Sequence, residues 1–328
     1  MNGRSAASSR QSPVVNDVRA FAVDVNYYLS QDPRQLPSRY LYDELGSCLF
    51  ESICRLPWYA ITRAEMRLLA AHGHEILRAA SPLARIVELG CGSGEKLATL
   101  IASGRPPGPV ELHLVDLSAT ALAQSARTLN GLEGVRIVTH EVTYEAGLEE
   151  VHDAPQPRGR TLALLLGSNL GNFDPPGADE FLRAIRAALQ PGDLFVLGAD
   201  LVKPARVLLL AYDDPLGVTA AFNRNLLVRI NRALDGDFDL DGFVHRARWN
   251  AAESRVEMHL VSLRQQDIRV AAAGLAFTIE EGESIWTESS YKYEAEEIGA
   301  VAERAGFSRA AQWIDVEDGF ALTLVEAA

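Results

Sequence analysis

The sequence predicts an α/β fold built on a doubly wound, Rossmann-like sheet, and three observations lead there. Five short apolar runs alternate with segments of helical periodicity, which is the pattern of parallel strands joined by helices. A glycine-rich turn follows the first run, and an aspartate ends the second, as in nucleotide-binding sheets. The five predicted strands cover residues 85–89, 110–115, 134–139, 161–166 and 193–198.

The regions on either side of these strands predict additional structure. Residues 14 to about 80 lack strand alternation and carry turn signals at Asp32-Pro33 and Leu36-Pro37, so we expect a helical N-terminal lead-in. A stretch after residue 200 is rich in helical periodicity and then partly alternating, which indicates an inserted α+β subdomain. A helix over 294–305 and two antiparallel strands within 310–316 and 320–327 should complete the main sheet.

These patterns predict a division of the chain into parts. The first residues are small and polar, which is typical of a disordered tail. The main sheet should form the cofactor-binding domain, and the insertion should bind the substrate. The expected boundaries are 1–13 for the tail, 14–200 with 290–328 for the sheet domain, and 201–289 for the inserted subdomain.

Composition narrows the classes of partner. The 328 residues carry a net charge of −13 and 48% apolar residues, so the chain can bury a sizeable core but offers no basic stripe for nucleic acid. Its three cysteines and seven histidines show no metal-ligand spacing, and no signal peptide or long apolar span is present. We therefore expect a cytoplasmic monomer that acts on small molecules, without a metal or a membrane partner.

The stretch RIVELGCGSGEKLATL, residues 85–100, indicates the cofactor. Gly90, Gly92 and Gly94 allow positive φ and close approach of a ligand to the backbone, which dinucleotides also exploit. Glu88 discriminates between the two ligands. A carboxylate just ahead of the turn repels a pyrophosphate but attracts the ammonium and sulfonium groups of S-adenosylmethionine. The charge therefore favours S-adenosylmethionine over a nicotinamide cofactor.

Asp116 ends the second predicted strand, VELHLVD, at residues 110–116. In nucleotide-binding sheets a carboxylate at this place accepts hydrogen bonds from the ribose hydroxyls. The alternative is that Asp116 caps a helix beginning near Leu117. We favour the ribose role because strand, glycine turn, helix, strand and acid follow one another in the expected order.

Three further segments carry candidate substrate contacts. In LLLGSNLGNF, residues 164–173, turn preference is as good an explanation of Asn169 as a ligand contact, whereas Asn172 lies just past the strand edge where such sheets bind ligands. The segment AYDDPLGVTAAFNRN, residues 211–225, contains Tyr212 before a proline turn. In ESIWTESSYKY, residues 283–293, Glu288 and Ser290 should share one face of a strand, a spacing that is more often simply solvated.

Together with YLYDELGSCLFESICRLPWYAITRAE (residues 40–65) and HRARWNAAESRVEMHL (residues 245–260), these segments resemble the histidine Nα-methyltransferases of ergothioneine biosynthesis, which make the trimethylated betaine hercynine. The resemblance runs from about residue 20 to the end of the chain, insertion included. It implies a methyltransferase sheet, S-adenosylmethionine as the cofactor, and trimethylation of the α-amino group of L-histidine. A related enzyme acting on another aromatic amino acid, such as tryptophan, is the alternative. A nicotinamide enzyme and a non-catalytic binding protein are the alternatives from other classes.

The resemblance also implies roles for individual residues. Asn172 and Tyr212 would hold the substrate carboxylate, and Glu288 and Ser290 would bind the imidazole. The remaining substrate contacts would be Tyr59 near the α-amine, Phe50 as an aromatic wall and Met258 beside the ring. On the donor side the matching residues are Tyr42 at the methionine end, Gly90 and Gly92 in the turn, Lys96 and Asp116.

One departure from the family pattern lies at the adenine. The family usually has an aspartate followed by phenylalanine there, whereas this sequence has Thr143 and Tyr144. A hydroxyl accepts the adenine amino hydrogen less strongly than a carboxylate does. We further hypothesise that Tyr59 takes or relays the ammonium proton, and that Tyr42 and Phe50 line the cationic head group.

Overall fold

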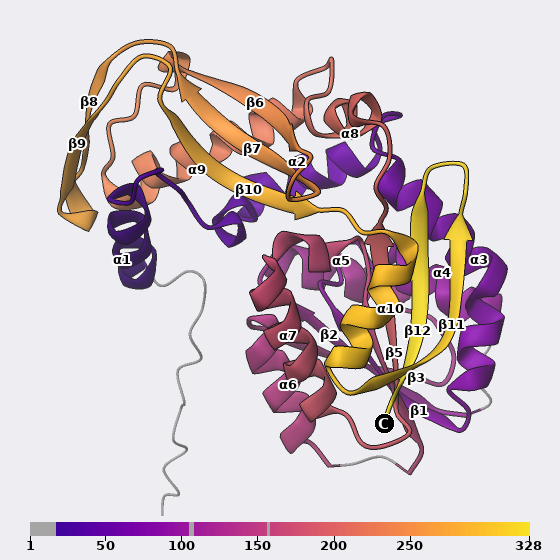
Figure 1. Cartoon of the computed structure of the whole chain (residues 1–328). Coiled ribbons are helices and arrows are strands. Elements are labelled where there is room, and N and C mark those ends of the chain that lie inside the picture. The colour runs from indigo at the N-terminus through magenta and orange to yellow at the C-terminus, as the bar shows by residue number, and fades with distance from the viewer. Residues whose placement is uncertain (1–17, 105–107, 156–157) are drawn as a thin grey trace, which may run out of the picture.

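The computed structural model describes residues 18–104, 108–155 and 158–328, so the tail predicted at 1–13 lies outside the described residues. Figure 1 shows two lobes: a large sheet flanked by helices, and a smaller lobe above it that is built around strands β6, β7 and β10. The predicted α/β class with an inserted α+β subdomain is confirmed. The proposed domain boundaries stay a prediction.

A seven-stranded sheet forms the larger lobe. Its members are β1 (Leu83–Leu89), β2 (Val110–Asp116), β3 (Val135–Glu141), β4 (Arg160–Leu165), β5 (Leu194–Asp200), β11 (Phe307–Asp315) and β12 (Phe320–Ala327). The strand order is β11-β12-β5-β4-β1-β2-β3. Strands β1 to β5 are parallel to one another, and β12 runs antiparallel to both of its neighbours, β5 and β11. The order reverses between β1 and β4, and ligands bind beyond the carboxyl ends of strands at such a switch point.

Helices cover both faces of this sheet and bury one apolar core on each (Figure 1). Three of these helices have a side-chain cap: Ser118, Thr143 and Asp174 each accept a hydrogen bond from the backbone amide three residues further on. Pro175, which follows Asp174, occupies the first position of its helix, where proline is favoured. One face carries α3 (Ala60–Ala79), α4 (Glu95–Ser103) and α5 (Ala119–Leu129), and the other carries α6 (Tyr144–Asp153), α7 (Pro175–Ala188) and α10 (Ala295–Arg304).

The smaller lobe contains a three-stranded antiparallel sheet in the order β10-β7-β6 and a β8-β9 hairpin. Helix α9 packs on that sheet. The bounds are α8 (Ala205–Tyr212), α9 (Val218–Leu234), β6 (Phe243–Asn250), β7 (Arg255–Ser262), β8 (Gln266–Val270), β9 (Leu275–Ile279) and β10 (Ser284–Tyr291). Short 3-10 helices occupy Ser38–Leu41 (η1), Asn169–Asn172 (η2), Leu240–Gly242 (η3) and Ala271–Ala273 (η4).

The N-terminal helices join the two lobes. Helix α1 (Val18–Leu29) and η1 pack against α9 of the smaller lobe, and the backbone amide of Leu36 donates to the carbonyl of Trp286 at 2.8 Å. Helix α2 (Glu44–Cys54) packs on α9, and it also contacts α3 and α5 of the larger lobe. The helical lead-in thus spans the space between the lobes. No described helix is both long and apolar enough to cross a membrane.

Candidate methyl-donor and substrate site

The glycine turn after β1 forms the floor of a cavity. Gly90, Gly92 and Gly94 all have positive φ, as the sequence predicts, and Gly94 precedes the first residue of α4. A Cβ atom added to Gly90 would lie 2.6 Å from the Tyr144 hydroxyl and 2.9 Å from Asn169 Nδ2. The turn therefore needs glycine for its conformation and for the close approach of its neighbours.

The cavity above the turn measures about 330 Å³, which suits a small-molecule ligand. Gly90, Gly92 and Asp116 line one side of it, and Tyr42 and Tyr144 line another. Tyr144 lines this cavity together with Asp116, and Thr143 lines the neighbouring cavity, to which Tyr144 also belongs. These sequence-predicted donor residues are therefore brought together.

Asp116 points its carboxylate back to the glycine turn. Its Oδ2 accepts from the Gly92 amide at 3.3 Å and its Oδ1 from the Ser118 amide at 2.9 Å. Burial raises the pKa of Asp116, and the backbone hydrogen bonds oppose that rise. The helix-cap alternative is wrong, because α5 begins at Ala119 and its cap is the Ser118 side chain, which accepts from Ala121. Asp116 stays available to a ligand in the cavity.

Lys96 lies at the opposite end of the donor region, in a cavity that it shares with Gly90, Gly92 and Gly167. Its ammonium is 2.7 Å from Glu65 Oε2, and Glu65 also accepts from the Gly167 amide at 2.8 Å. Burial lowers the pKa of Lys96, but the adjacent Glu65 carboxylate outweighs that effect and raises this pKa overall. Glu65 was not foreseen from the sequence, because its partners are distant along the chain.

Glu88 is placed differently from the sequence-based expectation. Its side chain is buried beneath the turn and lines none of the donor or substrate cavities formed by the described residues, and its Oε2 has no hydrogen-bond partner. Burial raises the pKa of Glu88 to about 8, and the nearby Lys96 opposes that rise. A carboxyl with this pKa is mostly protonated at neutral pH, so Glu88 is not the charged ligand contact that the sequence suggested.

The predicted substrate residues converge on one small cavity next to the donor cavity. Its lining comes from α2, the start of α3, η2, α8, α9, β7 and β10. The two cavities share Tyr42, Phe50, Asn169 and Asn172. The predicted residues in this lining are Tyr42, Phe50, Tyr59, Asn172, Tyr212, Met258, Glu288 and Ser290.

Strand β10 supplies the two polar groups expected at the imidazole. Glu288 and Ser290 face the same cavity, and Met258 of β7 is the register partner of Glu288. Burial raises the pKa of Glu288 to about 7, although the positive charge of Lys292 opposes that rise. Ser290 Oγ accepts from the Tyr212 hydroxyl at 2.8 Å. This strand face is therefore a pocket wall and not a solvated surface.

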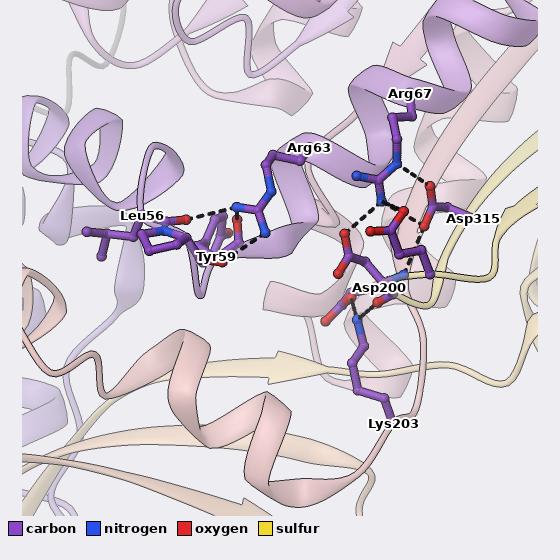
Figure 2. Close-up of polar contacts among 10 residues, drawn as sticks. Leu56, Tyr59, Arg63, Arg67, Asp200, Lys203 and Asp315 are labelled. Carbon is purple, nitrogen blue, oxygen red and sulfur yellow. Dashed lines mark hydrogen bonds and ion pairs between the residues drawn. The ribbon is translucent and has the colours of Figure 1, made fainter.

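Tyr59 precedes the first turn of α3, and its ring lies 6.3 Å from the ring of Tyr212. Arg63, one turn along α3, donates to the carbonyls of Leu56 at 2.9 Å and of Tyr59 at 3.3 Å (Figure 2). These contacts fix the backbone that carries Tyr59. Burial raises the pKa of Tyr59 well above its ordinary value, so its side chain is a neutral phenol at physiological pH.

Sequence reasoning missed several pocket residues, Phe222 and Thr219 among them, and left Asn169 open. Phe222 of α9 completes an aromatic wall with Tyr42 at 5.5 Å and Phe50 at 6.0 Å between ring centroids. Thr219 lines the same cavity with a buried hydroxyl that has no partner. Asn169 lines both cavities, so its position is not explained by turn preference alone. Thr219 and Phe222 lie in the 211–225 segment already singled out, and their spacing of three residues puts them on one face of α9.

Among the described residues, no group of three or more His, Cys, Asp or Glu side chains is arranged to hold a metal ion. Hydroxyl, amide and aromatic groups make up much of the lining of these cavities, and the charged side chains in it are Glu51, Arg55, Glu95, Lys96, Asp116 and Glu288.

The parallel sheet, its antiparallel final strands and the cavity at the switch point define the class as a Rossmann-like α/β methyltransferase. More narrowly, the chain belongs to the family of S-adenosylmethionine-dependent, histidine-specific methyltransferases, whose model matches residues 21–327. The methyl donor predicted from the glycine turn is thereby confirmed.

Three relatives illustrate the range of similar proteins. A histidine N-alpha-methyltransferase of Mycobacterium tuberculosis is 41% identical, over 92% of this chain and 93% of that protein. "Ergothioneine biosynthesis protein 1" of Neurospora crassa is 28% identical over 85% of this chain, which corresponds to 34% of that longer protein. An L-tryptophan methyltransferase of Psilocybe serbica is 26% identical over 90% of this chain and 88% of that protein.

Proposed function

We propose that this protein transfers three methyl groups from S-adenosylmethionine to the α-amino nitrogen of L-histidine, giving hercynine for ergothioneine biosynthesis. One observation carries the proposal. A single cavity adjoining the donor cavity is lined at once by Glu288 and Ser290, which suit an imidazole, and by Asn172 and Tyr212, which suit a carboxylate. The family and the 41% identical relative support the same substrate.

The donor region fits S-adenosylmethionine. Gly90 lines the donor cavity with a bare backbone, and a side chain there would collide with Tyr144 and Asn169, which line the same cavity. Asp116 would accept hydrogen bonds from ribose hydroxyls, Lys96 would pair with the carboxylate of the methionine part, and Thr143 with Tyr144 would contact the adenine. When bound, this cofactor supplies an electrophilic methyl group on a sulfonium. The protein itself needs no nucleophile for that transfer.

The substrate residues would act as a clamp on both ends of histidine. Asn172 and Tyr212 bind the carboxylate, and Glu288 with Ser290 binds the ring, so the amine between them has a fixed position. Fixing reacting groups in this way is worth effective molarities of roughly 10⁵ M or more in intramolecular models. Positioning is therefore the main catalytic contribution of the chain.

Tyr59 and Tyr42 are the residues that we assign to the amine. Burial raises the pKa of each phenol well above its ordinary value, so neither is a stored base. The Tyr59 oxygen accepts a hydrogen bond from the α-ammonium and relays its proton, while Tyr42 and Phe50 present aromatic faces to the growing cation. The rate should then rise with pH as the free amine becomes more abundant.

Tryptophan is the alternative substrate. An indole has one N–H donor and no acceptor nitrogen, whereas a neutral imidazole has one of each. Bound tryptophan would leave the Ser290 hydroxyl hydrogen without an acceptor. A site built to hydrogen-bond a substrate strongly rejects an analogue that leaves its polar groups unpaired. The pair formed by Glu288 and Ser290 therefore favours histidine.

The proposal is tested by comparing Glu288→Ala with the wild type on histidine and on tryptophan, with mass spectrometry of the products. Histidine methylation should fall at least about a hundredfold, because a buried ring N–H loses its charged acceptor. Tryptophan methylation, slow in both proteins, should change much less. Unchanged histidine turnover in the variant would remove Glu288 from the substrate pocket.

A further inference from the structure

A buried ammonium group lies directly behind the substrate pocket. Lys292 follows the last residue of β10, and its side chain is fully shielded from solvent. Its Nζ donates to the Tyr212 hydroxyl at 2.8 Å and to Ser290 Oγ at 2.9 Å, and it lies 3.0 Å from Asp200 Oδ2. Lys292 thus contacts two pocket hydroxyls without lining the pocket itself.

The hydrogen-bond donors of Lys292 and the acceptors around it are equal in number. An ammonium has three N–H donors and no acceptor, and Lys292 has three acceptors around it, so every donor is used. The Tyr212 and Ser290 oxygens must both accept from Lys292. Ser290 also accepts from the Tyr212 hydroxyl at 2.8 Å, so the hydrogen of Ser290 is left to point into the cavity.

The surroundings of Lys292 keep its side chain protonated. Burial lowers the pKa of Lys292, but the Asp200 carboxylate and the hydrogen bonds with Tyr212 and Asp200 outweigh this and raise it overall. The ammonium also lies 4.7 Å from the centre of the Tyr212 ring. Asp200 has a second cationic partner in Lys203, at 2.6 Å, as Figure 2 shows.

We propose that Lys292 is a positioning residue that, together with the Tyr212 hydroxyl, turns the hydroxyl hydrogen of Ser290 toward the substrate. The inference rests on the proposed function, since it requires an imidazole in the pocket. Ser290 then donates to one ring nitrogen while Glu288 accepts from the other. This pattern matches a neutral imidazole and excludes an imidazolium, whose two N–H groups would oppose the hydrogen of Ser290.

The test is calorimetric binding of L-histidine in the presence of S-adenosylhomocysteine, together with steady-state kinetics. Lys292→Met keeps the length of the side chain but removes its donors. We expect the Kd and KM for histidine to rise about tenfold or more, as for lost hydrogen bonds to a charged group, with a smaller change in kcat. Affinity for S-adenosylmethionine should stay within about twofold of wild type.

A pH series separates positioning from mere structural support. Wild-type affinity for histidine should fall as pH drops below about 7, because the ring, with a pKa of roughly 6.5, and Glu288, whose pKa burial raises to about 7, both take up protons there. The same series in Glu288→Gln, which does not titrate, gives the share of the fall that is due to the ring. Adding Lys292→Met to Glu288→Gln frees the Ser290 hydroxyl to rotate and accept, so that share should flatten. In a Tyr212→Phe/Ser290→Ala background, Lys292→Met should add little further loss, because its targets are gone.

Lys203→Met is the matched control, since it removes the other lysine of Asp200 and leaves the pocket hydroxyls untouched. Its histidine Kd should stay within about twofold of wild type. An equal loss in both lysine variants, or an unchanged Kd and pH profile in Lys292→Met, would overturn the inference. If Lys292→Met does not fold, Asp200→Asn/Lys292→Met removes both charges for the same measurements. Failure of the wild type to bind histidine would instead reject the proposed function.

Discussion

Replacing Glu288 by glutamine should make the protein more stable and a poorer enzyme. Burial raises the pKa of Glu288 from an ordinary 4.5 to about 7 in the folded chain. A carboxyl with a raised pKa binds its proton more tightly in the folded than in the unfolded state. Wild-type stability should therefore decline as pH rises from about 4.5 to about 7, and stay reduced above that.

The size of this effect follows from the two pKa values. Each pKa unit is worth about 1.4 kcal/mol, so deprotonating Glu288 costs about 3 kcal/mol of folding free energy at pH 9. Glutamine has no charge to desolvate. The free energy of unfolding of Glu288→Gln should exceed that of wild type by up to about 3 kcal/mol at pH 9, and the difference should shrink toward zero near pH 4.5.

Urea unfolding of both proteins at pH 5, 7 and 9 measures this difference. Glu88, whose pKa burial raises to about 8, is present in both proteins and cancels. Glu257 on the adjacent strand is the matched control. Burial would raise its pKa, but Asn250, Arg255 and His259 outweigh that effect and lower it, so Glu257→Gln should lose stability at pH 7. A Glu288→Gln difference that does not vary with pH would refute this reasoning.

Three other variants test the donor region. Asp116→Asn should weaken S-adenosylmethionine binding about tenfold by removing charge-assisted hydrogen bonds, with histidine affinity nearly unchanged; equal donor Kd values in calorimetry would rule out the ribose role. Thr143→Asp should keep α6 intact, because aspartate caps helices as well as threonine does, and should tighten donor binding several-fold; weaker binding would contradict an adenine contact there. Glu65→Gln removes the ion pair that holds Lys96, so the Kd for the donor should rise several-fold. A Kd equal to that of the wild type would show that Lys96 does not depend on Glu65 for its position.

Much of the larger lobe could be predicted because its signals are local. Each predicted parallel strand lies within a few residues of an observed one, since apolar runs between helical segments are legible without tertiary contacts. The antiparallel strands at the C-terminus were likewise foreseen. Helix α1 could not be placed, because its docking on η4 and α9 joins segments about two hundred residues apart.

The site residues likewise fall into those that local sequence signals predict and those that they do not. Gly90 was found from the glycine-rich turn and Asp116 from the end of the next predicted strand, whereas the roles of Glu288 and Ser290 came from resemblance across the insertion. Asp116 and its neighbour Ser118 were harder to separate, because aspartate and serine both cap helices and only the observed hydrogen bonds show which one does. Glu88 was expected at the ligand, but strand alternation alone does not say whether a side chain reaches the cavity or lies beneath it.

Lys292 shows what sequence reasoning cannot supply. It lies at the end of the 283–293 segment, yet its meaning depends on Asp200 at the end of β5 and Tyr212 in α8. No spacing rule links these three positions. Their convergence is a product of the fold, and it becomes visible only when donors and acceptors are counted in three dimensions.

The most direct test of the account is a methyl-transfer screen of the twenty amino acids with S-adenosylmethionine, with products read by mass. Histidine should gain three methyl groups on its α-nitrogen. Tryptophan and phenylalanine should react far more slowly, by up to on the order of 10⁴, because they leave polar pocket groups unpaired. Faster methylation of tryptophan than of histidine, or no methylation of histidine, would contradict the central claim that the pocket is built for an imidazole.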